Sequence, residues 1–413
     1  MRNAALIVVA ALAAGIGLGA YAHGLNDARV DSAIGAAGAV GGLWLNALRM
    51  TVVPLLFALL VTGVGAVADA AATGRLAYRA MALFAVLIVV AAVYGVAATG
   101  AALALWPVDP NQARAFIAAA PAPEPFVAPD FAQWFAGLMP PNPIAAAAEG
   151  QVLQIVAFAI VLGFAATRLP EDLRTPFIAF HRALAEAMIT IVRWVLLLAP
   201  LGVFALALTV GAQAGAGAVG VLFQYVVIVS LVTFGSVLLA FVIGVAFGRM
   251  PALRFAAASA PVWAVAFSTQ SSLASLPLMV ERTRDALGVA PRIAGVVLPM
   301  AVAVFRFTSP VANLAVALFV VALYGLEPSA VQIAAAIAVA FAISVGSVGL
   351  PGQVSFFASV APICAALGAP IDLLPILLAV EVIPDIFRTL GNVTADMAAT
   401  TILARDEKPA QDA

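Results

Sequence analysis

The chain of 413 residues is 65% hydrophobic and only 9% charged, which is more apolar surface than one water-soluble core of this size can bury. We therefore expect an integral membrane protein in contact with membrane lipid. The net charge is −1 and Lys408 is the only lysine, so no basic stripe exists that could neutralise phosphates, and nucleic acid is excluded as a partner. The single Cys364 excludes an internal disulfide, and two histidines leave almost no ligands for a Cys/His metal site.

Long hydrophobic runs predict six spanning helices in the first 248 residues. A bilayer core about 30 Å thick needs roughly 20 apolar residues per helix. The first run ends in Ala20-Tyr21-Ala22, which also fits a signal-peptide cleavage site, but its length and the many spans that follow favour an uncleaved helix. The six runs occupy residues 4–22, 40–68, 80–106, 150–168, 177–210 and 218–247.

The arginines predict how these helices are oriented. Arg2, Arg75, Arg168 and Arg249 fall at alternate ends of successive runs, which predicts a cytoplasmic amino terminus. The proline-rich stretch 107–148 is interpreted as an irregular external excursion, and no soluble domain is expected. The alanine-rich, lysine-poor composition suggests a GC-rich bacterial genome, and hence a multi-pass protein of a bacterial inner membrane.

Beyond residue 249 two segments are predicted to be re-entrant hairpins. The polar stretch 268–272, which contains Ser271 and Ser272, lies between two apolar runs that are each too short to cross a bilayer. A second stretch, 347–352, contains Gly349 and Gly352, which permit a tight tip and close approach of the backbone to a ligand. Non-helical backbone at membrane depth is tolerated only where it is buried in protein or lines a wet cavity.

Each predicted hairpin is followed by one spanning helix with a polar middle, at Thr308-Ser309 and at 385–396. The two units enter from opposite sides of the membrane, which is the inverted-repeat arrangement of secondary transporters with a site at the midplane.

A polar stripe on the last helix is expected to carry the chemistry. Its six residues fall within roughly 100° of arc at about 100° per residue, so they face the protein interior rather than lipid. Arg388 suits a carboxylate, Asp385 suits an ammonium group, and the hairpin tips offer backbone N–H groups to a second carboxylate. These are the groups of an acidic amino acid, although a structural salt-bridge network is the alternative. The stripe consists of Glu381, Asp385, Arg388, Thr389, Asn392 and Asp396.

The segment 385–396, Asp-Ile-Phe-Arg-Thr-Leu-Gly-Asn-Val-Thr-Ala-Asp, resembles the last-helix signature of the glutamate transporter family, the dicarboxylate/amino acid:cation symporters. Residues 142–154, the serines at 271–272 and Gly-Leu-Pro-Gly at 349–352 resemble further motifs of that family. The resemblance implies an all-α membrane fold of eight transmembrane helices plus two re-entrant hairpins. It also implies a homotrimer in which scaffold helices (1–79 and 149–217) support a moving transport domain (80–148 and 218–413).

The resemblance also implies roles for single residues. Arg388 would bind the substrate's side-chain carboxylate, Asp385 its amino group, and Thr389 and Asn392 the substrate as well. Asp396 would belong to a cation site. An acid at position 385 places the chain in the amino acid branch rather than the C4-dicarboxylate branch, and Ser309 is grouped with the substrate-binding residues.

The chain departs from the family where sodium is normally bound. The family reads Asn-Met-Asp-Gly-Thr in its seventh helix, whereas this chain has Phe-Arg-Phe-Thr-Ser at 305–309, and residues 80–93 contain no hydroxyl or amide side chain. Oxygen ligands suited to a hard cation are thus lost. Arg306 has three interpretations: a structural partner for a carboxylate of the last helix, a tethered cation in place of sodium, or a substrate contact.

The leading hypothesis is therefore a sodium-independent secondary transporter of aspartate or glutamate that is proton-coupled or exchanging. Glu381 is the protonatable group, and no cofactor is expected. The alternatives are a sodium-coupled symporter, or a transporter of another dicarboxylate or amino acid. An intramembrane enzyme is disfavoured because the broken segments contain no histidine base and no cysteine. An ion channel is disfavoured because it would need a continuous wet path lined by several helices, whereas the polar residues here concentrate in two hairpins and two helices.

Overall fold

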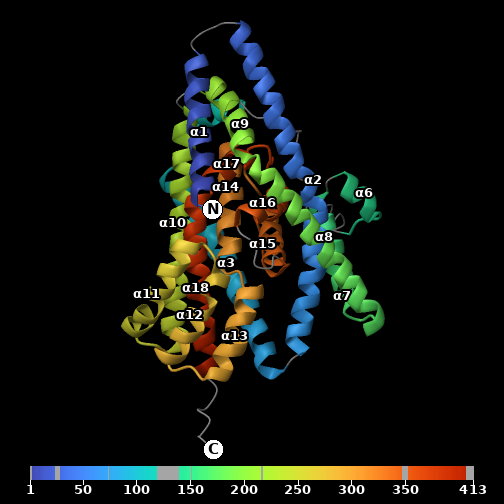
Figure 1. Cartoon of the computed structure of the whole chain (residues 1–413), viewed down its shortest axis with the longest axis vertical. Helices are drawn as coiled ribbons and strands as arrows, with labels where there is room; N and C mark the ends of the chain where they lie inside the picture. The colour runs from blue at the N-terminus through green and yellow to red at the C-terminus, as the bar shows by residue number, and fades with distance from the viewer. Residues whose placement is uncertain are drawn as a thin grey trace, which may run out of the picture.

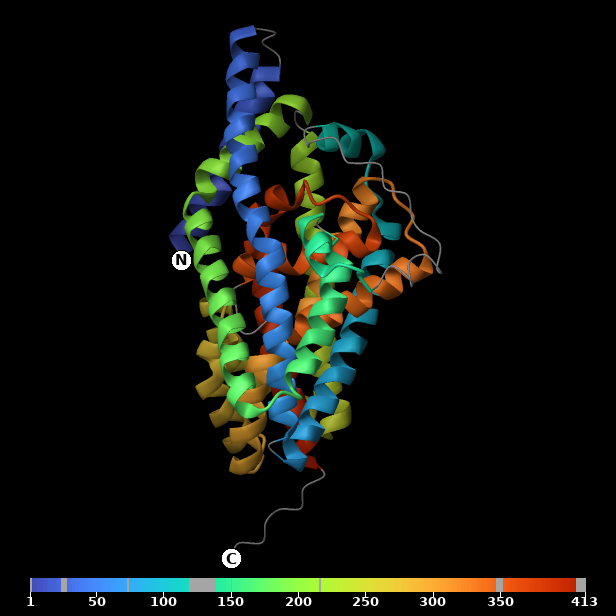
Figure 2. The same ribbon diagram turned by 90° about the vertical axis from the view of Figure 1, so that its right-hand side faces the viewer.

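The structure, a computed structural model, describes residues 2–23, 28–72, 74–118, 139–149, 151–214, 217–346 and 352–405. These residues form helices and turns, and no strand occurs among them. Most helices run along the long axis of the molecule (Figures 1 and 2). Five stretches are long and apolar enough to cross a membrane: Ser32–Gly65, Arg75–Leu105, Glu171–Leu197, Gly217–Gly248 and Pro291–Leu323. The predicted all-α membrane fold is confirmed.

The helices of the first half are α1 (Arg2–His23), α2 (Ala28–Ala72), α3 (Arg75–Leu105), α4 (Pro110–Ala118), α6 (Pro143–Ala148), α7 (Val152–Ala166), α8 (Glu171–Leu197) and α9 (Ala199–Ala214). Those of the second half are α10 (Gly217–Gly248), α11 (Ala252–Thr269), α12 (Ser272–Asp285), α13 (Pro291–Val304), α14 (Thr308–Leu323), α15 (Ala330–Gly346), α16 (Gly352–Leu367), α17 (Leu374–Val380) and α18 (Val382–Arg405). In Figure 1, α1, α2, α8 and α9 lie toward the outside, and α14 and α18 lie between the other elements.

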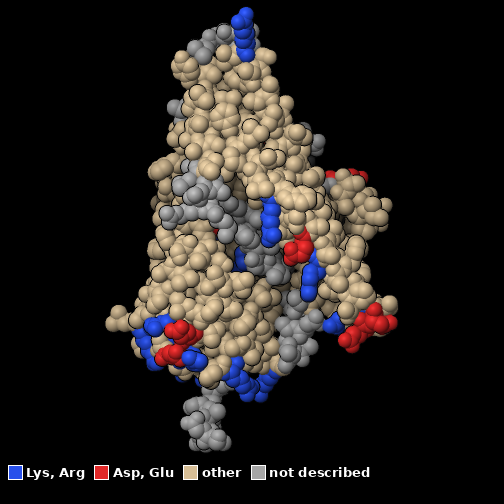
Figure 3. All heavy atoms as spheres, viewed as in Figure 1, with Lys and Arg blue, Asp and Glu red and all other residues tan. Residues whose placement is uncertain are grey.

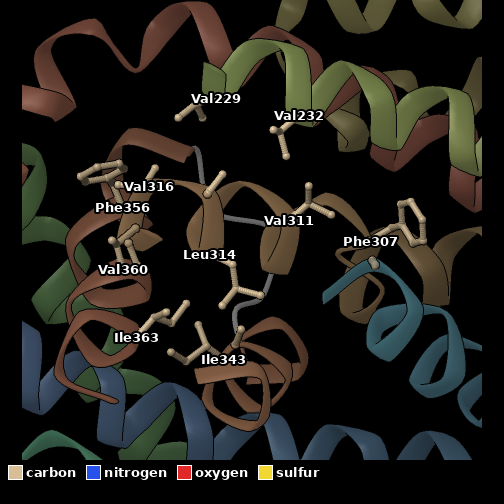
Figure 4. Close-up of a cluster of buried hydrophobic side chains, with 14 of the residues drawn as sticks. Val229, Val232, Phe307, Val311, Leu314, Val316, Ile343, Phe356, Val360 and Ile363 are labelled. Atoms are coloured by element: carbon tan, nitrogen blue, oxygen red, sulfur yellow. The ribbon is translucent and has the colours of Figure 1, made fainter. Parts of the chain in front are cut away.

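Helix α14 forms the apolar centre of the second half. Every residue from Pro310 to Val321 is buried, as expected for a helix that is apolar on all sides. Phe356, Val360 and Ile363 of α16 pack beside α14 in the hydrophobic cluster of Figure 4. A buried apolar helix thus carries the polar residues at its own amino-terminal end.

Both predicted hairpins correspond to pairs of adjacent short helices. Helices α11 and α12 pack against each other and are joined at Gln270, which adopts a left-handed conformation (φ 50°, ψ 36°). Helices α15 and α16 also pack against each other, and their connection at 347–351, with Gly349, lies outside the described residues.

The two spanning segments that follow the hairpins are both interrupted. The first stops being helical after Val304 and resumes at Thr308, so Arg306 lies in the break between α13 and α14. The second is interrupted at a single residue, Glu381, between α17 and α18. Each break therefore holds one of the charged residues singled out in the sequence.

Two predictions about local structure were wrong. The run 177–210 was expected to form one helix, but it divides at Leu198 into α8 and α9, because Pro200 has no N–H with which to continue the hydrogen-bond ladder. The excursion at 107–148 was expected to be irregular, but α4 and α6 lie within its described part. The Asp109 carboxylate accepts from the Asn111 amide at 2.7 Å, and this cap followed by Pro110 is a helix-start signal.

Part of the charged surface gathers at one end of the molecule. Figure 3 shows a group of acidic and basic side chains at its lower end, and further charged side chains in the middle, on the right edge and at the top of this face, with uncharged surface between them. Exposed Arg254, Arg284 and Asp285 belong to the α11–α12 region at that end (Figure 1).

Small residues bring α1 and α9 into close contact. A Cβ added at Gly19 would lie 2.3 Å from the Leu208 carbonyl oxygen, and one added at Gly15 would lie 2.7 Å from the Ala207 Cβ. At Gly17, on the exposed face of α1, an added Cβ would meet nothing within 4 Å. Close packing of helix backbones through small residues is typical of membrane interiors.

We expect Gly19→Ala to destabilise the protein and Gly17→Ala to leave it unchanged or slightly stabilised. The first adds a methyl group to backbone that cannot move away, at a cost of about 1–3 kcal/mol, whereas the second only improves helix propensity. Thermal unfolding of the two purified variants in detergent measures the difference. Equal melting temperatures would contradict the α1–α9 packing described above.

Candidate functional site

The polar stripe of α18 is buried, as its spacing predicts. Asp385, Arg388, Thr389, Asn392 and Asp396 are all less than a tenth exposed. The stripe is enclosed by α10, α11, α13 and α14, which pack against α18. Because a charge in hydrocarbon costs about 2.5–3.5 kcal/mol on insertion scales, these charges require partners inside the protein.

Arg388 has two such partners. One of its terminal nitrogens forms an ion pair with the carboxylate of Glu381, and the other donates to the Asn313 side-chain carbonyl at 3.0 Å. Its Nε has no hydrogen-bond partner among the described residues. The residue that was predicted to bind a substrate carboxylate therefore already binds a carboxylate of the protein.

Glu381 is completely buried at the break between α17 and α18. Its second carboxylate oxygen accepts a hydrogen bond of 2.5 Å from the Tyr225 hydroxyl of α10. Both carboxylate oxygens are thus used, one by Tyr225 and one by Arg388. Tyr225 and Asn313 were not predicted from the sequence, because each is one of a few scattered polar residues in a mainly apolar helix and belongs to no polar stripe.

Thr308 joins the break before α14 to the stripe. Its backbone N–H donates to the Asn392 side-chain oxygen at 3.0 Å, and its hydroxyl lies 2.9 Å from the Arg388 carbonyl oxygen and 3.0 Å from the Asn392 side-chain oxygen. Gly391 makes this contact possible, since a Cβ there would lie 2.3 Å from the Thr308 methyl group. Thr308 was noted as part of a polar pair in the sequence, but its contact with Asn392 was not predicted.

Arg306 is partly buried in the break between α13 and α14. Its charge interacts with those of Asp385 and Asp396. Asp396 is 1% exposed, and neither of its carboxylate oxygens has a hydrogen-bond partner among the described residues. The guanidinium of Arg306 thus supplies positive charge to two buried carboxylates.

Aromatic rings occupy the positions on either side of Arg306. The Phe305 ring stacks on that of Phe84 in α3, with centroids 4.5 Å apart and planes at 9°. Phe305 also contacts Phe307 at 6.0 Å. Both phenylalanines are buried, so this part of the site presents ring carbon rather than oxygen to any cation.

The remaining predicted residues have more local contacts. The Ser271 hydroxyl accepts from the Ala274 amide at 3.2 Å and caps α12, and Ser272 is the first residue of that helix. Ser309 accepts from the Asn313 side-chain amide at 3.2 Å, and the Thr389 hydroxyl donates to the Asp385 carbonyl. Gly352 is the first residue of α16, and Gly349 lies outside the described residues. The structure thus joins Ser309 to the α18 stripe through Asn313, whereas the described hydrogen bonds of Ser271 remain within its own hairpin.

This arrangement can be compared with known proteins. The sequence profile of the sodium:dicarboxylate symporter family matches residues 5–406, nearly the whole chain. The chain belongs to this family. The resemblance seen in the last helix is therefore confirmed, and the chain is a secondary symporter of a membrane transporter family rather than a member of an enzyme family.

Several known transport proteins are similar to this chain over most of their length. The proton/glutamate-aspartate symporter of Escherichia coli is 27% identical over 97% of this chain and 92% of its own. The human neutral amino acid transporter A is 30% identical over 96% and 81%, and the proton/sodium-glutamate symport protein of Bacillus caldotenax is 25% identical over 89% and 87%. These relatives differ from one another in substrate and in coupling ion.

We expect Thr308→Val to weaken the site of this symporter. The substitution keeps the shape but removes the hydroxyl that bonds to the Arg388 and Asn392 oxygens, at a cost of about 1 kcal/mol. Thr99→Val is the matched control, because the Thr99 hydroxyl is equally buried but bonds only to Gly95 of its own helix. Thermal unfolding in detergent should show the larger loss for Thr308→Val, and the reverse order would contradict the described contacts.

Proposed function

We propose that the protein is a sodium-independent secondary transporter of acidic amino acids, such as aspartate or glutamate, with the proton as coupling ion. The observation that carries the proposal is that Arg306, in the break before α14, attracts two carboxylates of the α18 stripe, Asp385 and Asp396. A guanidinium fixed to the protein is present at every step of transport, so it neutralises these carboxylates without consuming an ion gradient.

The charges of the site support an acidic substrate that arrives with a proton. Two positive side chains, Arg306 and Arg388, face three acids, Glu381, Asp385 and Asp396, which leaves a net charge of −1 when all five are ionised. An acidic amino acid adds another negative charge. One accompanying proton restores the net charge of the empty site, so the loaded and empty forms would cross the membrane with the same charge.

The surroundings of Arg306 support independence from sodium. Sodium, like other hard cations, prefers oxygen ligands. Phe305 and Phe307 replace residues that the family uses for sodium, and they are buried and in contact with each other. The family relatives in Escherichia coli and Bacillus caldotenax are named as proton and as proton/sodium symporters, so coupling varies within the family.

A neutral amino acid is the second candidate substrate. The ion pair between Glu381 and Arg388 cancels the positive charge that would otherwise attract a side-chain carboxylate. The human relative named as a neutral amino acid transporter shows that the family includes such substrates. Asp385 could bind the ammonium group of either class of amino acid.

The cellular setting is part of the proposal. We place the protein in a bacterial inner membrane, which the alanine-rich, lysine-poor composition supports. A homotrimer with scaffold helices at 1–79 and 149–217, and a transport domain built from 80–148 and 218–413, is implied by the resemblance to the glutamate transporter family. Native mass spectrometry of the purified protein tests the trimer.

The direct test is uptake of radiolabelled L-aspartate into proteoliposomes under a sodium gradient, a proton gradient or neither. We expect uptake that ignores sodium and follows the proton gradient. Sodium-driven uptake by the unmodified protein would refute the tethered-cation role of Arg306. Uptake of L-alanine or L-serine in place of L-aspartate would favour the neutral substrate.

Arg306→Met should lower sodium-free aspartate uptake tenfold or more, because it removes the positive charge that compensates the buried carboxylates of Asp385 and Asp396. Arg193→Met is the control, since Arg193 is an exposed arginine of α8. Equal uptake by the two variants would contradict the electrostatic role assigned to Arg306.

A further inference from the structure

The guanidinium of Arg388 is held by two different kinds of partner. Glu381 contributes a charged carboxylate, and Asn313 contributes a neutral carbonyl oxygen at 3.0 Å. Asn313 is itself fixed, because its amide nitrogen donates to the Ser309 hydroxyl at 3.2 Å. Loss of the Glu381 contact would therefore leave Arg388 positioned by Asn313, with one terminal nitrogen and Nε available to a new carboxylate.

The position of Glu381 suits reversible release of Arg388. Its other oxygen accepts from the Tyr225 hydroxyl at 2.5 Å, and a hydroxyl can act as donor or acceptor. A protonated Glu381 can therefore donate to Tyr225 in place of accepting from it. Glu381 also lies between α17 and α18, where its N–H donates to the Leu378 carbonyl at 3.2 Å and its own carbonyl accepts from the Asp385 N–H at 3.0 Å, so the backbone is held on both sides and the side chain alone changes partners.

We infer that Glu381 is an internal competitor for the substrate's side-chain carboxylate, and that it must take up a proton before Arg388 can bind the substrate. Tyr225 and Asn313 are positioning residues in this exchange. The proton adds to the Glu381 carboxylate, the ion pair with Arg388 opens, and the substrate carboxylate takes the vacated place on the guanidinium. Binding of one substrate carboxylate to Arg388 thus requires the uptake of one proton by Glu381. This inference rests on the proposed acidic substrate.

Other charged and titratable groups set the conditions for this exchange. Asp385 on α18 acts on Glu381 with a like charge, and Arg388 acts on it with an opposite charge. Cys364 on α16 has a minor electrostatic influence on Tyr225. We assign the proton to Glu381 rather than to Asp385 or Cys364, because its carboxylate contacts both Tyr225 and Arg388.

The first test compares the unmodified protein with Glu381→Gln in proteoliposomes. The amide has nearly the same shape as the carboxyl group but cannot change its charge. Aspartate affinity of the unmodified protein should fall about tenfold per pH unit above the transition, as linkage to one proton requires. Glu381→Gln should retain exchange of labelled for unlabelled aspartate at a rate independent of pH, and should lose uptake driven by a proton gradient.

The second test removes the hydroxyl that holds Glu381. Tyr225→Phe leaves the carboxylate with one donor fewer, so the pH range over which aspartate affinity falls should move upward. Tyr94→Phe is the matched control, because the Tyr94 hydroxyl donates to the Val232 carbonyl of the same helix α10 at 3.1 Å and does not contact Glu381. Its pH profile should match that of the unmodified protein.

The outcomes separate this inference from the proposed function. Proton-driven uptake by Glu381→Gln, or a pH profile of that variant equal to the unmodified one, would overturn the competitor role while leaving acidic transport intact. If the unmodified protein binds no acidic amino acid at any pH, the proposed function fails and the competitor role fails with it. Equal pH profiles for Tyr225→Phe and Tyr94→Phe would remove Tyr225 from the exchange.

Discussion

The balance of buried charge governs the second half of this protein. Five ionisable side chains lie among helices that are otherwise apolar, and each charge left unbalanced in hydrocarbon costs several kcal/mol. The charges of the two arginines and the three acids balance except for one excess negative charge. Glu381 and Arg388 form a direct ion pair, whereas neither carboxylate oxygen of Asp396 has a hydrogen-bond partner among the described residues. A negatively charged substrate would add to this excess, so it can enter the site only if the net charge of the site is adjusted at the same time. The gain of one proton is the smallest such adjustment.

The helix breaks follow from the same requirement. Irregular backbone is tolerated at membrane depth only inside the protein or beside a wet cavity, and here both breaks lie against the α18 stripe. Arg306 occupies one break and Glu381 the other. The first holds a permanent positive charge that attracts Asp385 and Asp396, and the second holds a protonatable acid in an ion pair with Arg388. The site thus combines one charge that is always present, on Arg306, with one that can be gained or lost with a proton, on Glu381.

The sequence predicted those features that depend on the spacing of residues within a single helix. The spacing of the α18 residues placed them on one face, and their burial confirms that this face is interior. Tyr225 and Asn313 could not be predicted, because they meet Glu381 and Arg388 across 156 and 75 residues of chain, and periodicity says nothing about such contacts. Likewise, hydropathy gave the apolar run 177–210 but not its division at Leu198, which depends on Pro200. The roles of the hairpin residues remain predictions.

The central claim is that one proton crosses with one acidic amino acid, so that the loaded site carries the same charge as the empty one. Sodium-free aspartate uptake into proteoliposomes under either a pH gradient or a valinomycin-clamped potassium potential tests this directly. The account predicts accumulation under the pH gradient with the potential clamped at zero, and none under the potential alone. Accumulation driven by the potential at equal pH on both sides would contradict it.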